Sequence, residues 1–354
     1  MTLTTLLVIF TAALLVAAVT TPLARRAGIH WGFVDHPSAR KIHARPMPRF
    51  GGIAMVGAVL IALLVFEGRY GIEQLASILI GASWVSILGA LDDRWGLRPL
   101  YKLLGQIGAA VFLILFGVQV SFLPAEWLNW AVTIVWMVGI TNAINFLDNM
   151  DGLAGGVVAI AAGYFLLLAV QSGQYLVGGL AAALLGASVG FLFYNLNPAS
   201  IFMGDTGSLF LGFVLAALGI KLRFPGNSPT VTWMVPVLVL ALPIFDTTLV
   251  VISRLRRGVH PATAGKDHIS HRLVRKGFTQ RETVMLLYLV SGMSGTVAQF
   301  VTHANILEAY MLCGAVLVLA LYAMWWLERI PLESTSDSEK DAAPGARLPS
   351  DQAW

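Results

Sequence analysis

The chain has little charge and almost no cysteine, and each scarcity excludes a class of protein. Only 12% of its 354 residues are charged and 57% are apolar, a balance too hydrophobic for a soluble globular domain. The single cysteine, Cys313, lies inside an apolar run, which excludes a disulfide framework and a metal-thiolate site. No P-loop pattern and no GxGxxG after a strand occurs, so the sequence supports neither a P-loop ATPase nor a Rossmann domain.

Long apolar runs recur along the chain. Crossing roughly 30 Å of hydrocarbon takes about 20 apolar residues in a helix, and the period-two alternation of a membrane barrel is absent. The sequence therefore predicts an all-α, polytopic membrane bundle in residues 1–330, followed by a disordered polar tail, 331–354. About eleven transmembrane helices are expected, at 3–24, 52–66, 75–91, 103–122, 128–147, 153–171, 175–194, 207–221, 231–253, 284–302 and 306–327.

Basic residues are distributed unevenly between the predicted loops. The segments 25–49, 92–102 and 254–281 and the tail after residue 328 contain 20 of the 23 Lys and Arg residues. The positive-inside rule places these segments in the cytoplasm and the N-terminus outside. The net charge of +4 then suits anionic lipid headgroups on the inner face, and nucleic acid is not required as a partner.

Acidic residues and histidines gather on the same predicted face, at the edge of a bilayer where an unpaired charge costs several kcal/mol. The acids are Asp35, Asp92, Asp93, Asp148, Asp151, Asp205 and Asp267. The histidines are His36, His43, His260, His268 and His271. The predicted outer turns are chemically plain by comparison, so this concentration indicates a functional site on the inner face.

Helix capping is the alternative explanation for some of these acids. Asp151 and Asp205 each precede an apolar run and are well placed as N-caps. Asp92 and Asp93 instead follow a predicted helix, and two negative charges at its C-terminal end are costly unless a cation joins them.

Three asparagines follow the spacing of one helix face. Asn142, Asn145 and Asn149 recur at i, i+3 and i+7, with Asp148 and Asp151 at the flank. For Asn142 alone, amide hydrogen bonds to a neighbouring helix are the favoured interpretation. The two acids beside the stripe point instead to ligand binding.

The available oxygen ligands predict a hard cation, Mg²⁺ or Mn²⁺. Magnesium usually takes one or two carboxylates together with substrate phosphates, so a diphosphate substrate is the natural partner. Basic residues in 254–281 offer phosphate contacts, although membrane topology alone also explains them. Asp246, an acid inside a predicted span after Pro243, ranks below the loop acids as a candidate.

Five motifs in order resemble the polyprenyl-phosphate N-acetylhexosamine-1-phosphate transferases, the glycosyltransferase 4 superfamily of WecA, TagO and MraY. They cover Asp35 to Leu273 and read DHPSARKIHARPMPRFGG, LDDRWG, NFLDNMDGLAGG, NPASIFMGDTGSL and DHISHRL. The chain is more similar to the WecA/TagO branch, because PRFGG replaces a PTMGG-type stretch and DHISH replaces a run of histidines. Ser270 stands where the WecA/TagO pattern has a histidine.

The resemblance implies Mg²⁺-dependent transfer of a sugar-1-phosphate, GlcNAc-1-phosphate in particular, from a UDP-N-acetylhexosamine to undecaprenyl or another polyprenyl phosphate, with release of UMP. It implies an inner (plasma) membrane protein, possible homodimers and a role in starting cell-envelope polysaccharide synthesis. The roles that it implies are Asp92 and Asp93 as catalytic acids; Asp205, Asp151 and Asp148 at the metal; Asn145, Asn149, Asn195, Phe202, His268, His271 and Arg272 at the nucleotide sugar; and Lys41 and Lys102 at the lipid phosphate.

Two rival functions stay open from sequence. One is the MraY-type transfer of a UDP-MurNAc-pentapeptide precursor within the same superfamily. The other is secondary transport of an anionic solute, since intramembrane acids and broken helices also mark transporters. Transport would need polar residues leading to the outer face, where the sequence offers only scattered charges.

Overall fold

The computed structural model describes residues 2–35, 46–64, 72–224, 227–261, 263 and 265–331, and these are almost entirely helical. The elements are α1 (Leu3–His30), β1 (Val34–Asp35), β2 (Met47–Pro48), α2 (Gly51–Leu63), α3 (Ile72–Trp95), α4 (Pro99–Leu115), α5 (Glu126–Leu147), α6 (Leu153–Gln171), α7 (Tyr175–Asn195), α8 (Gly204–Lys221), α9 (Pro229–Thr232), α10 (Met234–Val239), α11 (Ala241–Arg256), α12 (Ile269–Arg275), α13 (Gln280–Val301) and α14 (Ile306–Glu328). The all-α prediction is confirmed, apart from the two-stranded β1–β2 sheet.

Among the described residues, eight helices are long and apolar enough to cross a membrane: α1, α3, α5, α6, α7, α8, α13 and α14. Helices α2 and α4 are apolar but shorter. The protein is therefore a multi-pass membrane protein. Nearly all of the predicted tail, from residue 332 onward, lies outside the described residues.

The continuous helix predicted over 231–253 is wrong, because this stretch is divided into α9, α10 and α11. The interruption between α10 and α11 falls at Leu240, three residues before Pro243. Proline has no N–H to donate to the carbonyl of Val239, and its ring crowds that carbonyl, so the regular hydrogen-bond pattern stops there. Asp246 follows on α11 as a fully buried residue.

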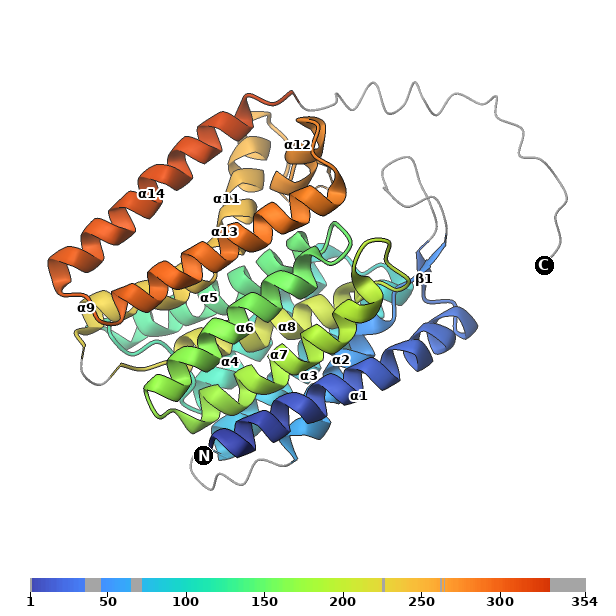
Figure 1. Cartoon of the computed structure of the whole chain (residues 1–354), viewed down its shortest axis with the longest axis horizontal. Coiled ribbons are helices and arrows are strands. Elements are labelled where there is room, and N and C mark those ends of the chain that lie inside the picture. The colour runs from blue at the N-terminus through green and yellow to red at the C-terminus, as the bar shows by residue number, and fades with distance from the viewer. Residues whose placement is uncertain are drawn as a thin grey trace, which may run out of the picture.

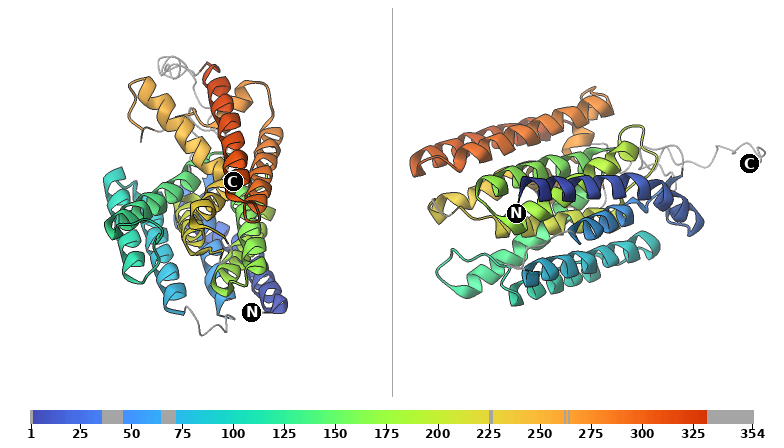
Figure 2. Two further views of the ribbon diagram at one scale, coloured as in Figure 1. Left: turned by 90° about the vertical axis from the view of Figure 1, so that its left-hand side faces the viewer. Right: turned by 60° about the horizontal axis from the view of Figure 1, so that its bottom comes forward.

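Helix α8 lies at the centre of the bundle. Its side chains are buried along almost its whole length, and α3 and α5 pack against it. Figure 1 shows α14 along one margin of the molecule and α1 along the opposite margin. In Figure 2, α11 to α14 gather on one side of the bundle. Only 6% of the apolar window of α14 is buried within the protein, as expected for a helix that faces lipid.

Glycines allow the closest helix crossings. On α7, a Cβ at Gly186 would lie 2.2 Å from the carbonyl oxygen of Phe10, and one at Gly190 would lie 2.4 Å from that of Leu14. Two glycines four residues apart therefore bring α7 directly onto the backbone of α1, the small-xxx-small arrangement of membrane helix pairs. Burial of Ala13 and Ala17 on α1 completes the contact.

The N-terminal hairpin leads the chain to the start of α8. Strands β1 and β2 pair antiparallel, with Val34 opposite Pro48. Immediately after β2, the amides of Gly51 and Gly52 donate to the carbonyls of Phe202 and Met203 at 3.0 and 2.9 Å. The PRFGG motif is thus a backbone clamp on the segment that opens α8.

Candidate functional site

Asp93 caps α8 from a different helix. It lies in the last turn of α3, and its carboxylate accepts hydrogen bonds from the amides of Asp205 and Thr206, both at 3.0 Å, and from the Thr206 hydroxyl at 2.8 Å. These amides belong to the first turn of α8, which lacks a side-chain cap of its own. The charge that is unfavourable at the end of α3 is therefore stabilised by the positive end of α8.

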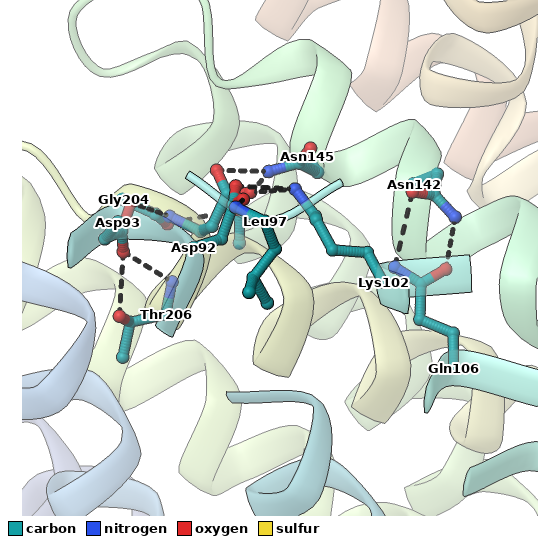
Figure 3. A network of polar contacts seen from close by, with 11 residues as sticks. Asp92, Asp93, Leu97, Lys102, Gln106, Asn142, Asn145, Gly204 and Thr206 are labelled. Carbon is teal, nitrogen blue, oxygen red and sulfur yellow. Dashed lines mark hydrogen bonds and ion pairs between the residues drawn. The ribbon is translucent and has the colours of Figure 1, made fainter. Parts of the chain in front are cut away.

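Asp92 and Asp205 share the ammonium group of Lys102. The Lys102 Nζ lies 2.9 Å from Asp92 Oδ2 and also donates to Asp205 Oδ2. Figure 3 shows the lysine reaching from α4 toward the acid cluster. The negative charge of Asp92 is thus balanced by a side chain of the protein itself.

The asparagines of α5 divide into a site residue and a packing residue. Asn145 Nδ2 donates to Asp205 Oδ1 at 3.0 Å and to the Ser208 hydroxyl at 2.8 Å, so Asn145 orients the Asp205 carboxylate. Asn142, one turn before Asn145 on α5, donates from Nδ2 to the Gln106 side-chain oxygen on α4 (Figure 3). The interpretation of Asn142 as an interhelical amide contact is confirmed.

Glycine is required where these elements meet. Gly204 has φ +66°, and a Cβ there would lie 2.6 Å from Asp93 Oδ2 and 2.9 Å from the carbonyl oxygen of Arg49. The left-handed conformation and the crowding both exclude a larger side chain. On α3, a Cβ at Gly89 would lie 2.3 Å from the carbonyl oxygen of Asp205. The acids converge because small residues let the backbones touch.

Arg49 is a site residue that sequence reasoning missed. Its guanidinium pairs with Asp35 at 3.3 Å, and 38% of its side chain remains exposed. Burial opposes its charge, but the surrounding carboxylates outweigh this and raise the pKa of Arg49. Those carboxylates are Asp35, Asp93, Asp205 and Asp148. The PRFGG motif contained the signal, because its arginine immediately precedes the clamp on α8.

Asp148 and Asp151 are separated in role. Asp148 ends α5, and burial raises its pKa to about 7 although Arg49 opposes the shift. Asp151 accepts hydrogen bonds from Asn197 Nδ2 at 3.1 Å and from the amide of Ala199 at 3.0 Å, which holds the α7–α8 connection. Neither Asp148 nor Asp151 caps α6 with its side chain, so the capping alternative for Asp151 is wrong. The capping alternative for Asp205 is also wrong, because Asp205 lies inside α8.

The predicted metal set is not assembled as three ligands. Within the described ranges, no group of three or more His, Cys, Asp or Glu side chains is arranged to hold a metal ion. Asp92 and Asp205 nevertheless converge on one cationic group, with the amide of Asn145 beside them. Two carboxylates fit Mg²⁺, which usually takes only one or two carboxylate ligands from a protein when substrate phosphates fill its other coordination positions.

The DHISH motif docks onto the loop after α5. The Ser270 hydroxyl donates to Asn149 Oδ1 at 2.6 Å, so the predicted sugar residue Asn149 joins this loop to α12. His268 and His271 lie side by side with ring centroids 6.1 Å apart, and the His268 ring also contacts Phe146 edge-on. The motif thus reaches the segment that carries Asn145.

Two residues predicted at the nucleotide sugar, Arg272 and Asn195, are buried and hydrogen-bonded within the protein. Arg272 is 1% exposed and donates to the carbonyls of Asp267 and Leu327 and to the Ser253 hydroxyl, each at 2.8 Å. All three guanidinium nitrogens are therefore used inside the protein, and the contact of Arg272 with the substrate stays a prediction.

Asn195 is likewise 2% exposed. It accepts from the amide of Gly152 at 3.1 Å and donates to the carbonyl of Ile201 at 2.9 Å. These bonds tie the start of α6 to the approach of α8. Half-buried Phe202 lies on that approach, with its backbone bonded to Pro48 and Gly51. Lys41, predicted at the lipid phosphate, lies outside the described residues.

His271 provides a test of the electrostatics of this loop. Burial and the neighbouring His268 lower its pKa from 6.5 to about 4. Between these two values the unfolded chain binds a proton that the folded protein does not, so His271 lowers stability as the pH falls. The His271→Gln variant is expected to gain melting temperature relative to wild type as the pH falls from about 7 to about 5, measured in detergent. If the difference in melting temperature between the variant and wild type stayed the same across this pH range, the lowered pKa of His271 would be contradicted.

The fold and this cluster define a class: a polytopic helical membrane protein with an acid-rich polar site at one end of its bundle, formed by α3, α4, α5 and α8. Comparison with known proteins agrees. The model of glycosyl transferase family 4 matches residues 75–223. These residues include the acids of α3 and α8 that form the cluster, together with Lys102 of α4 and Asn145 of α5.

Several known proteins align with most of the chain. A probable undecaprenyl-phosphate N-acetylglucosaminyl 1-phosphate transferase of Bacillus subtilis is 36% identical over 80% of this chain and 82% of its own. A decaprenyl-phosphate N-acetylglucosaminephosphotransferase of Mycolicibacterium smegmatis is 32% identical over 84% and 82%. An undecaprenyl-phosphate alpha-N-acetylglucosaminyl 1-phosphate transferase of Escherichia coli is 24% identical over 85% and 84%. The chain therefore belongs to the polyprenyl-phosphate N-acetylhexosamine-1-phosphate transferase superfamily.

Proposed function

We propose that this protein transfers GlcNAc-1-phosphate from UDP-GlcNAc to a polyprenyl phosphate and releases UMP. The observation that carries the proposal is the convergence of Asp92, Asp93 and Asp205 from two helices, with Lys102 between two of them. The names of its relatives support the same reaction. The cluster lies where a chain of membrane-spanning helices meets its polar loops, which suits one substrate that is soluble and one that is a lipid.

We also propose that Mg²⁺ assists the reaction, held by Asp205 and Asp92 together with the diphosphate of the substrate. When bound, the ion would supply positive charge to the transferring phosphoryl group. Asn145 would keep the Asp205 carboxylate oriented, and Asp93 would hold the start of α8 in place. Lys102 would then be free to contact the lipid phosphate.

The reaction is a displacement at the β-phosphorus of the nucleotide sugar. An oxygen of the polyprenyl phosphate forms the new P–O bond, and the bond between the β-phosphorus and the bridging oxygen breaks, so that UMP leaves with that oxygen. A phosphate group has a second pKa of about 6, so the lipid phosphate is largely dianionic at neutral pH and needs little help from a base. The protein's main task is to bring two anions together, for which Arg49 and Lys102 provide positive charge.

Arg49 is proposed to bind the diphosphate of the nucleotide sugar. Arg49→Ala is expected to raise KM for UDP-GlcNAc by about 10- to 100-fold, because a hydrogen bond to a charged group contributes about 1.5–3 kcal/mol. Arg49→Lys should recover part of this loss. Steady-state kinetics of UMP release provide the measurement. Arg98→Ala, an exposed arginine at the start of α4, is the matched control, and equal effects of the two alanine variants would refute the assignment.

The membrane arrangement completes the proposal. Eleven spans with the N-terminus outside would place the acid cluster at the cytoplasmic face of the inner membrane, where a nucleotide sugar is available. The distribution of basic residues supports this orientation. Single cysteines introduced into a Cys313→Ser background, one near Arg98 and one near Glu126, should label with an impermeant thiol reagent from opposite sides. Labelling of both cysteines from the same side would reject the arrangement.

Homodimers are testable by light scattering of the detergent-solubilised protein.

The decisive test of the reaction uses purified protein, polyprenyl phosphate and UDP-GlcNAc. UMP release that requires both substrates and Mg²⁺, with the lipid product identified by mass spectrometry, is the expected result. Turnover with a UDP-MurNAc-pentapeptide and none with UDP-GlcNAc would favour the MraY-type alternative. Uptake of an anionic solute into proteoliposomes without UMP release would indicate transport.

A further inference from the structure

A buried acid and a histidine form a pair behind the DHISH motif. Asp246 of α11 is 0% exposed, and its Oδ2 lies 2.7 Å from His268 Nδ1. Its other oxygen, Oδ1, accepts a hydrogen bond from the amide of Ile269 at 2.8 Å. Both oxygens of the carboxylate are therefore directed at the start of α12. The motif reasoning ranked this acid below the loop acids, yet the structure gives it a specific partner.

The pair defines the hydrogen-bonding state of the imidazole. A carboxylate can only accept hydrogen bonds, so the ring nitrogen that faces it must carry a proton. In the neutral ring the proton then lies on Nδ1, and Nε2 keeps its lone pair. Within the described ranges Nε2 makes no hydrogen bond, and 7% of His268 is exposed.

The position of the ring connects it to the site. His268 contacts Phe146, which directly follows Asn145, the partner of Asp205. The adjacent Ser270 is bonded to Asn149. The imidazole is thus fixed on one side by Asp246 and lies against the segment 145–149 on another, next to Asn145, which orients the carboxylate of Asp205 in the proposed site.

We propose that Asp246 is a positioning residue: it fixes a proton on Nδ1 of the His268 ring, so that Nε2 can accept a hydrogen bond from a hydroxyl or amide N–H of the sugar. This inference rests on the proposed function for the identity of the ligand. Asp246 itself does not contact the substrate. A packing role alone would require the Ile269 bond and would not require a carboxylate, because an amide oxygen also accepts a hydrogen bond.

Asp246→Asn separates these roles. The Asn oxygen can keep the bond to Ile269, while its Nδ2–H donates to His268 Nδ1 and shifts the ring proton to Nε2. The ring would then present a donor where an acceptor is needed. We expect kcat/KM for UDP-GlcNAc to fall by about 100-fold, with the melting temperature close to wild type. Thr248→Ala, an exposed position on the same helix, is the control and should keep wild-type kinetics.

The double variant tests whether Asp246 acts through His268. His268→Gln and Asp246→Asn/His268→Gln are expected to have the same kcat/KM within about twofold, since groups that act as a unit are not additive. Losses that multiply would show that Asp246 acts independently and would overturn the proposal.

Nitrogen-15 NMR of histidine-labelled protein gives a reading that does not depend on catalysis. The signal of His268, assigned by its loss in His268→Gln, should report Nδ1–H in wild type and Nε2–H in Asp246→Asn. A wild-type Nε2–H form would refute the positioning role even in an active enzyme. Failure of wild-type protein to release UMP would instead refute the proposed function, so the two failures are distinguishable.

Discussion

Asp205→Asn is expected to lower the rate of UMP release by about 100-fold or more while the protein still folds. Asparagine has nearly the same shape, so the start of α8 and its bonds to Asp93 can remain. The substitution removes the negative charge that faces Lys102 and the oxygen proposed for the metal. Loss of a single electrostatic group in such a site typically costs two to three orders of magnitude, about 10²–10³ in rate.

The measurement compares transfer rates at saturating substrates, with gel filtration and a melting temperature in detergent to verify folding. Glu126→Gln is a suitable control, because it also neutralises an acid but at the far end of α5, about 30 Å from Asn145 along the helix. Wild-type turnover by Asp205→Asn would remove this carboxylate from the mechanism.

Gly89→Ala should impair both stability and catalysis. An added Cβ would lie 2.3 Å from the carbonyl oxygen of Asp205 and 2.6 Å from the amide of Thr206, and backbone atoms cannot move aside as a flexible side chain can. Overpacking of this kind costs about 1–3 kcal/mol. It should also push α3 away from α8, so that Asp93 loses its bonds to the first turn. We expect at least a 100-fold loss of activity, since a misplacement of about 1 Å can cost that much.

Gly108→Ala on the neighbouring α4 is the matched control, because no atom of another described helix lies within 4 Å of the added Cβ. The melting temperature and the rate of UMP release should fall together in Gly89→Ala and remain near wild type in Gly108→Ala. A fully active Gly89→Ala protein would show that the α3–α8 spacing does not govern the site.

Sequence patterns predicted the fold class well because apolar length and helix periodicity are local properties. Most predicted apolar runs overlap a helix, but 103–122 extends past the end of α4 at Leu115, and 231–253 is interrupted. The break at Leu240 arises from Pro243, whose missing N–H was visible in the sequence. The small β1–β2 hairpin was not predicted, since two-residue strands leave no periodic signal.

The site was predicted less evenly. Asp92, Asp93, Asn145 and Asp205 were expected to gather, and they do. Their partners were not predictable, because a cap supplied by another helix depends on tertiary contacts. The same limitation applies to Arg272, whose three internal acceptors, at residues 253, 267 and 327, could not be read from the sequence.

The contacts of α8 have a consequence for how the protein is made. Asp93, which caps the first turn of α8, and Gly51 and Gly52, which bond to the carbonyls just before it, all precede α8 in the chain. During synthesis from the N-terminus, the segments that contact the start of α8 are therefore already in the bilayer when α8 is inserted. Asp246 and His268 emerge later. A nascent chain halted after α8 would contain the acid cluster but not the histidine beside it, so assembly of the site is completed only when α12 has been translated.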